Sequence, residues 1–182
     1  SGYLAGKIAK GIDIRSLGSG STGATNVLRH IGKRAAIIVF LLDVSKGILS
    51  ILLAKHLLLN DSWQVAIGLS TLIGHSWPLW LNWKGGKAVA TGLGIFLGLS
   101  WQVGLATLGV FILMIALFRI VSLASITSAI ALPLIMFLSF DNSIISLPFL
   151  IISLLAMTLV IWRHRENLSR LVKGKEPKIG QT

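Results

Sequence analysis

Long apolar stretches separated by short polar segments set the pattern of this chain. The stretches cover residues 35–59, 63–83, 92–118, 120–140 and 144–162. Each is close to or longer than the ~20 apolar residues that an α-helix needs to cross a bilayer. They lack the short-range apolar–polar alternation of transmembrane β-strands. The pattern therefore predicts an all-α, polytopic membrane protein, with residues 1–182 forming a single domain.

The stretch 92–118 is too long for one simple span. It has no charged residue, and a single helix over it would measure ~40 Å, against a hydrocarbon core of ~30 Å. A hairpin that turns near Ser100 and Trp101 places every Lys and Arg except Lys46 and Lys55 on one side of the membrane. Because cytoplasmic loops are rich in basic residues, the hairpin is favoured. It gives six complete spans, with the C-terminal tail in the cytoplasm.

The composition agrees with this class and limits the partners. Hydrophobic residues make up 54% of the chain and charged residues 13%, with a mean hydropathy of +0.83. The net charge of +11 arises from basic residues that flank the apolar stretches, so nucleic acid is not an expected partner. The absence of cysteine excludes disulfides and thiol chemistry. Residues 1–9 look like the inner end of a helix, which predicts that the chain is N-terminally truncated. The polar pair at residues 141–142 is expected to form the last turn on the outer side of the membrane.

A polar, glycine-rich segment between residues 18 and 29 is the strongest candidate for chemistry. Small, hydroxyl-bearing or amide-bearing residues fill every position from Gly18 to Asn26, and Arg29 follows. Such a segment can offer backbone N–H groups, hydroxyls and a guanidinium to a phosphate. The glycine spacing matches a dinucleotide fingerprint, but no strand precedes it, and Ala24 stands where a Walker A lysine is required. We therefore expect a phosphate-binding loop of another kind.

Three further polar sets fall on the same side of the membrane in this topology. They lie at residues 74–91, 119–125 and 163–167. Polar groups at membrane depth usually pair within the bundle or line a site, so four sets at one face predict a single site there. The expected cations of this site are Arg29, Lys84, Lys87, Arg119, Arg163 and Arg165.

The four sets resemble the motifs of the bacterial acyl-phosphate:glycerol-3-phosphate acyltransferases, the PlsY family. The resemblance covers essentially the whole chain in order and spacing, with Ser21 in place of the usual Asn and Ala88 in place of the usual Gly. It implies seven transmembrane helices, of which six are complete here and the first is a stub. It also implies transfer of a fatty acyl group from acyl phosphate to the 1-hydroxyl of glycerol 3-phosphate, giving lysophosphatidate and phosphate. No cofactor or metal is implied, because an acyl phosphate is already activated.

The resemblance also implies roles for individual residues. We expect the phosphoryl group of the donor to be held by Ser19, Gly20, Ser21, Gly23, Thr25 and Asn26. Glycerol 3-phosphate is expected to be held by Arg29, Gly86, Lys87, Ser122 and Asn167, with Lys87 bridging both phosphates. The catalytic residues are then His164, Ser19 and Lys87. His164 is the candidate general base because its ordinary pKa lies near neutrality. The phosphate of the donor is the rival proton acceptor.

Other features have structural interpretations. Asp43 and Lys46, three residues apart, are expected to neutralise each other, and His75 to shape the turn that follows it. The spacing of His56 and Asp61 matches acyl-CoA-dependent acyltransferases, but these residues fall on the outer side and are assigned to chance. Four glycines are expected to allow close packing of helices, namely Gly94, Gly98, Gly104 and Gly109.

These features predict an enzyme of the bacterial plasma (inner) membrane whose site faces the cytoplasm. Its expected partners are acyl phosphate, glycerol 3-phosphate, membrane lipids and an enzyme that produces acyl phosphate. A transporter of phosphate or a small organophosphate is the alternative. Such a transporter is expected to place its site near the midplane, often with an internal repeat, and the chain shows neither feature.

Overall fold

The computed structural model describes residues 1–140 and 146–180, and these residues form helices and no strand. The helices are α1 (Gly2–Lys10), α2 (Ala24–His30), α3 (Lys33–His56), α4 (Asp61–Ser76), α5 (Val89–Leu99), α6 (Trp101–Phe118), α7 (Val121–Phe140), α8 (Leu147–Arg163) and α9 (Arg165–Val172), with short 3-10 helices η1 (Ile14–Ser16) and η2 (Leu79–Leu81). The predicted all-α class is confirmed. The turn expected at residues 141–142 lies outside the described residues.

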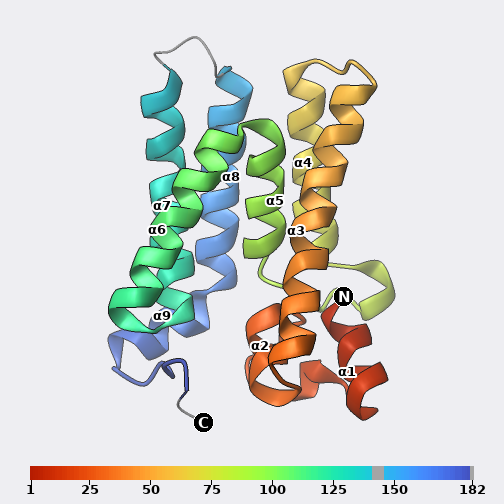
Figure 1. The fold of residues 1–182 in the computed structure, drawn as a ribbon, viewed down its shortest axis with the longest axis vertical. Coiled ribbons are helices and arrows are strands. Elements are labelled where there is room, and N and C mark those ends of the chain that lie inside the picture. The colour runs from red at the N-terminus through yellow and green to blue at the C-terminus, as the bar shows by residue number, and fades with distance from the viewer. Residues whose placement is uncertain (141–145, 181–182) are drawn as a thin grey trace.

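The long helices α3 to α8 run beside one another as a bundle (Figure 1). The short helices α1, α2 and α9 gather at one end of this bundle, which we call the polar end (Figure 1). Among the described residues, three helices are long and apolar enough to cross a membrane alone: α3, α6 and residues Val121–Ser139 of α7. The pair α8 and α9, bent by 62°, is a fourth candidate. Since α4 and α5 are shorter, the count of six spans stays a prediction.

The hairpin expected within residues 92–118 is confirmed. Helix α5 ends at Leu99, Ser100 is extended, and α6 begins at Trp101 and runs back alongside α5 (Figure 1). With only 11 residues, α5 ends inside the bundle, where its last carbonyls lack helical partners. Lys55 of α3 supplies them: its Nζ donates to the carbonyls of Gly98 at 2.7 Å and Leu99 at 3.2 Å.

The span predicted at residues 63–83 is wrong at its C-terminal end. Helix α4 stops at Ser76, and a loop containing η2 leads to α5. Pro78 explains the stop, because proline has no N–H for the helical ladder and restricts the residue before it. The loop turns through left-handed backbone at Asn82 and Trp83. This early stop brings residues 84–87 (Lys-Gly-Gly-Lys), which we call the glycine–lysine segment, to the polar end.

Helices α3 and α5 are in backbone contact through glycines. A Cβ added to Gly94 would lie 2.0 Å from the carbonyl oxygen of Val44, and one added to Gly47 would lie 2.3 Å from that of Thr91. Close packing also holds at two of the other predicted glycines, Gly98 and Gly104. The prediction is wrong for Gly109, which has open space around its Cβ position.

We predict that Gly94→Ala destabilises the protein strongly, because the added methyl group forces α3 and α5 apart. Thermal unfolding in detergent should show a large decrease in Tm or loss of folded protein. Gly109→Ala is the matched control, since it adds the same group to open space and removes a helical glycine that costs about 0.5–1 kcal/mol. Equal Tm values for the two variants would contradict the close contact.

Candidate active site

Asn26 organises the glycine-rich loop. Its side chain is buried, and Nδ2 donates to the carbonyls of Ile14 and Leu17, both at 3.0 Å, and Ser21 at 2.9 Å. Its Oδ1 accepts from the N–H of Ser19 at 3.3 Å. These bonds commit the amide of Asn26 to the loop itself. It does not line the cavity beside the loop, and its hydrogen bonds hold the shape of the loop.

A cavity of about 130 Å³ lies at the polar end, and we call it the polar cavity. It brings together segments that are far apart in the sequence: the glycine-rich loop, the start of α5, the start of α7 and the junction of α8 with α9. The predicted site residues that line it are Ser19, Ser21, Gly23, Thr25, Arg29, Lys87, Ser122, His164 and Asn167. The predicted residues that do not line it are Gly20, Asn26 and Gly86.

Gly86 supports the site through its backbone. The N–H groups of Gly85 and Gly86 donate to the carbonyls of Ser76 at 3.2 Å and His75 at 3.1 Å. The guanidinium of Arg163 donates to both glycine carbonyls, most closely to that of Gly86 at 2.9 Å. A Cβ on Gly86 would lie 2.0 Å from His75 Nε2. The segment is therefore held between α4 and α8, directly before Lys87.

Lys87 projects from this segment toward α9, where its Nζ donates to Asn167 Oδ1. Burial, followed by the positive charge of Arg170, lowers the pKa of Lys87 to about 8. The lysine is still mostly charged at pH 7. Of the other expected cations, Arg29 lines the cavity, and Arg163 holds the glycine carbonyls. The remaining three do not line it: Lys84, Arg119 and Arg165.

Glu176 is the main residue that the sequence analysis missed. It lies in the basic tail, is buried, and lines the polar cavity. Its Oε1 accepts from Ser122 Oγ at 2.8 Å and Asn167 Nδ2 at 2.6 Å, and its Oε2 accepts from Arg170 Nε at 2.7 Å. Burial raises the pKa of Glu176, but these hydrogen bonds outweigh burial and the pKa is lowered overall. A single acid among the basic residues that follow Arg170 was the available signal.

Asp43 and His75 form a second part of the wall that was not assigned to the site. The expected pair is present, because Lys46 Nζ donates to Asp43 Oδ1 at 2.9 Å. The same oxygen lies 3.7 Å from His75 Nδ1, and both Asp43 and His75 line the polar cavity. Among the described residues, no group of three or more His, Asp or Glu side chains is arranged to hold a metal ion.

His164 is held in one tautomer at the junction of α8 and α9. Its Nδ1 lies 2.8 Å from the carbonyl oxygen of Val160. Because a carbonyl only accepts, Nδ1 carries the proton and Nε2 keeps a free electron pair. Burial, followed by the positive charge of Lys87, lowers the pKa of His164 to about 4. The imidazole is therefore neutral at pH 7.

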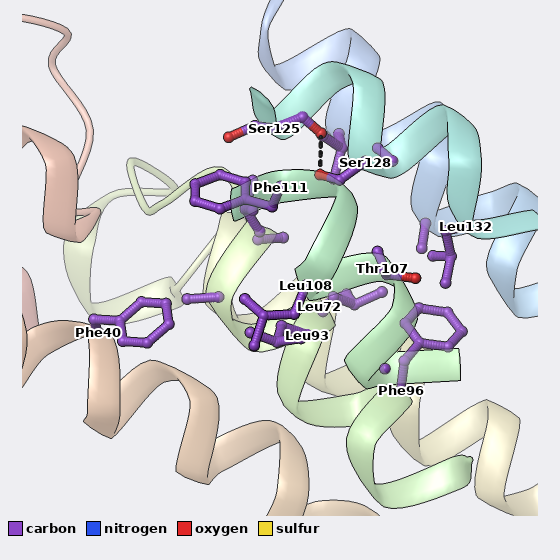
Figure 2. A pocket seen from close by; sticks show the side chains of 18 residues that line it. Phe40, Leu72, Leu93, Phe96, Thr107, Leu108, Phe111, Ser125, Ser128 and Leu132 are labelled. Carbon is purple, nitrogen blue, oxygen red and sulfur yellow. Dashed lines mark hydrogen bonds between the residues drawn. The ribbon is translucent and has the colours of Figure 1, made fainter. Parts of the chain in front are cut away.

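A second cavity, of about 90 Å³, adjoins the first, and we call it the apolar cavity. The two share part of their lining, including Phe40, Phe111 and Ser125. Figure 2 shows these three residues toward one side of the apolar cavity, with Phe96 and Leu132 toward the other. A charged site thus opens directly onto a hydrocarbon-lined space.

The family model described as glycerol-3-phosphate acyltransferase matches residues 1–174. The chain belongs to this family. Two relatives named glycerol-3-phosphate acyltransferase illustrate it. The relative from Prochlorococcus marinus (strain NATL1A) is 87% identical, with 100% of this chain and 91% of the relative covered. That from Parasynechococcus marenigrum (strain WH8102) is 59% identical, covering 100% and 84%.

Solved structures give the same assignment. The chain is similar to PlsY (YgiH), an integral membrane glycerol 3-phosphate acyltransferase, in its glycerol 3-phosphate form, with a TM-score of 0.88 and 39% identity. The lysophosphatidic acid form gives a TM-score of 0.85 and 38% identity. Both matches cover 98% of this chain and 88% of the solved chain. Membership of the acyltransferase family disfavours the transporter alternative.

For this acyltransferase we predict that kcat/KM for glycerol 3-phosphate decreases as the pH rises above about 8, because Lys87 then loses its charge. Lys87→Arg should move this decrease out of range, since the ordinary pKa of arginine is above about 12. The measurement is the pH profile of kcat/KM between about pH 6.5 and 10, a range that includes the pKa of Lys87. Lys84→Arg, in the same loop, should keep the wild-type profile. A Lys87→Arg profile that still decreases near pH 8 would contradict this assignment.

Proposed function

We propose that this protein transfers a fatty acyl group from an acyl phosphate to the 1-hydroxyl of glycerol 3-phosphate, giving lysophosphatidate and phosphate. The observation that carries the proposal is the junction of the two cavities. The polar cavity contains Arg29 and Lys87, while the apolar cavity beside it is lined by side chains such as Leu93 and Phe96. An acyl phosphate has the same two parts, a charged head and a hydrocarbon tail joined at the reacting carbon.

The head of the donor is assigned to the glycine-rich loop. Ser19, Ser21 and Thr25 bring hydroxyls to the polar cavity, and Gly23 leaves the backbone between them accessible. The acyl chain then extends past Phe111 and Ser125, which line both cavities. This arrangement places the acyl carbon at the boundary between polar and apolar surroundings.

Glycerol 3-phosphate is assigned to Arg29, near the end of α2, and to Lys87, Ser122 and Asn167, all of which line the polar cavity. Glu176 fixes the side chains of Ser122 and Asn167 by accepting a hydrogen bond from each. Because Lys87 bonds to Asn167 and lies in the same cavity as the glycine-rich loop, its charge can stabilise both phosphates. Holding both substrates in one orientation supplies a large part of the rate.

The reaction needs one bond to form and one to break. The 1-hydroxyl oxygen attacks the acyl carbon, and the bond from this carbon to the bridging phosphate oxygen breaks, so that phosphate leaves with the electron pair. The hydroxyl proton has two acceptors in the cavity, Nε2 of His164 and an oxygen of the donor phosphate. Lys87 and Arg29 stabilise the negative charge that develops. The variant His164→Ala distinguishes between these two acceptors. A decrease in kcat of only a few-fold would assign the proton to the donor phosphate.

The remaining proposals concern the membrane. The polar end faces the cytoplasm of a bacterial plasma membrane, and residues 35–162 contribute six complete spans. The excess of Lys and Arg at this end supports the orientation. Glycerol 3-phosphate then reaches the site from the cytoplasm, and the acyl phosphate reaches it from the lipid. An enzyme that produces acyl phosphate is the corresponding functional partner.

The test uses the full-length protein in lipid with glycerol 3-phosphate and either palmitoyl phosphate or palmitoyl-CoA. Released phosphate and lysophosphatidate are measured. We predict turnover with the acyl phosphate alone, and a decrease of at least about 100-fold in Arg29→Ala and Lys87→Ala, because each removes a cation from the charge that develops. Lys84→Ala is the control that leaves turnover intact. Turnover with palmitoyl-CoA alone would overturn the assignment of acyl phosphate as the donor. Phosphate uptake into liposomes without turnover of either donor would overturn the assignment of the protein as an enzyme.

A further inference from the structure

The apolar cavity, which we call the tube, is lined mainly by three helices, with one further position each from α3 and α4 and two from α8. Residues 89–96 of α5, 104–111 of α6 and 125–132 of α7 each contribute lining positions at spacings of three, four and seven residues. Such positions form one stripe along a helix face. Three stripes of equal length therefore run beside one another around the same space.

The tube has an open end and a closed end. Val89, Phe111 and Ser125 line both the tube and the polar cavity, so they mark the open end. Seven residues further along α5 and α7 lie Phe96 and Leu132, which line the tube alone. Both are buried in one hydrophobic core cluster with Leu99, Val103 and Met136, which lie just past the lining stripes of α5, α6 and α7 at this end. Figure 2 shows Phe96 and Leu132 on the side of the tube away from Phe111.

The length of the tube follows from helix geometry. Seven residues at a rise of about 1.5 Å give a depth of about 10 Å. With carbon–carbon bonds of about 1.5 Å, an extended hydrocarbon chain advances about 1.3 Å per carbon, so about eight carbons reach the floor and the remaining carbons of a longer chain such as palmitoyl must lie outside the tube. We propose that Phe96 and Leu132, as the floor of this tube, and Gly92, in its wall, set how the enzyme discriminates between acyl chains of different length. This inference rests on the proposed acyl-phosphate donor.

Gly92 keeps the tube open near its entrance. It lies one turn beyond Val89, is buried, and lines the tube. A Cβ built on Gly92 would meet only Leu72 Cδ2, at 3.8 Å, which is an ordinary contact. A larger side chain at this position would therefore extend into the tube without striking the backbone of another helix. It would leave room for the first few carbons of the acyl chain and exclude those that follow.

The test compares butyryl, octanoyl and palmitoyl phosphate as donors for the full-length enzyme in lipid, with Gly92→Leu as the variant. We expect kcat/KM with octanoyl and palmitoyl phosphate to fall about tenfold or more relative to butyryl phosphate, because methylene groups lose their burial. Gly92→Ala should give a smaller decrease in the same kcat/KM ratios. This variant keeps the inference testable if Gly92→Leu fails to fold. Phe96→Leu, which lowers the floor, should raise the ratio of palmitoyl to octanoyl turnover.

Gly109→Leu is the matched control. It adds the same side chain to an exposed position of α6 with open space around it, so its chain-length profile should equal that of the wild type. Equal losses with all three donors in Gly92→Leu, or no loss with any, would overturn the inference while leaving the acyl-phosphate reaction in place. Absence of wild-type turnover with every acyl phosphate would instead overturn the proposed function.

Discussion

The carboxylate of Glu176 is the interaction on which the polar end depends. Polar groups buried beside a membrane must satisfy one another, because an unpaired charge there is costly. Glu176 accepts hydrogen bonds from α7 through Ser122 and from α9 through Asn167 and Arg170, and Asn167 in turn accepts from Lys87. One anion thus joins the C-terminal tail, two helices and the glycine–lysine segment. Lys87 is therefore held in the cavity before any substrate phosphate binds.

The shortness of α5 connects this site to the hydrocarbon-lined space. The helix begins at the polar end, one residue after the left-handed backbone of Ala88, and ends inside the bundle, where Lys55 caps it. Its glycine face brings it against α3, while its opposite stripe leaves space toward α6 and α7. The same short element therefore places Lys87 at its start and forms a wall of the apolar tube. Head and tail of an amphipathic donor can be held by adjacent surfaces of one helix.

The sequence predicted the class, the break at Ser100 and nine of the residues that line the polar cavity, because chain length, charge sidedness and clustered polar residues are local features of the pattern. It did not predict how hydrogen-bonding capacity is used. Asn26 and Gly86 were expected to contact substrate, yet their polar groups are committed to the backbone of their own and neighbouring segments. Glu176 lies within a basic tail, and the charge pattern of that tail did not single it out as a site residue. Its role depends on the path of that tail back toward α7, which no periodicity in the sequence encodes.

The central claim is that both substrates occupy one cavity together and that no acyl-enzyme forms. Ser19 Oγ pairs with Ser21 Oγ at 3.1 Å, and neither hydroxyl donates a hydrogen bond to a described His, Asp or Glu side chain that could activate it as a nucleophile. The most direct test varies the concentrations of palmitoyl phosphate and glycerol 3-phosphate in one steady-state experiment. Double-reciprocal lines that intersect are the predicted result, because a ternary complex precedes transfer. Parallel lines, with a burst of phosphate before glycerol 3-phosphate is added, would contradict the account.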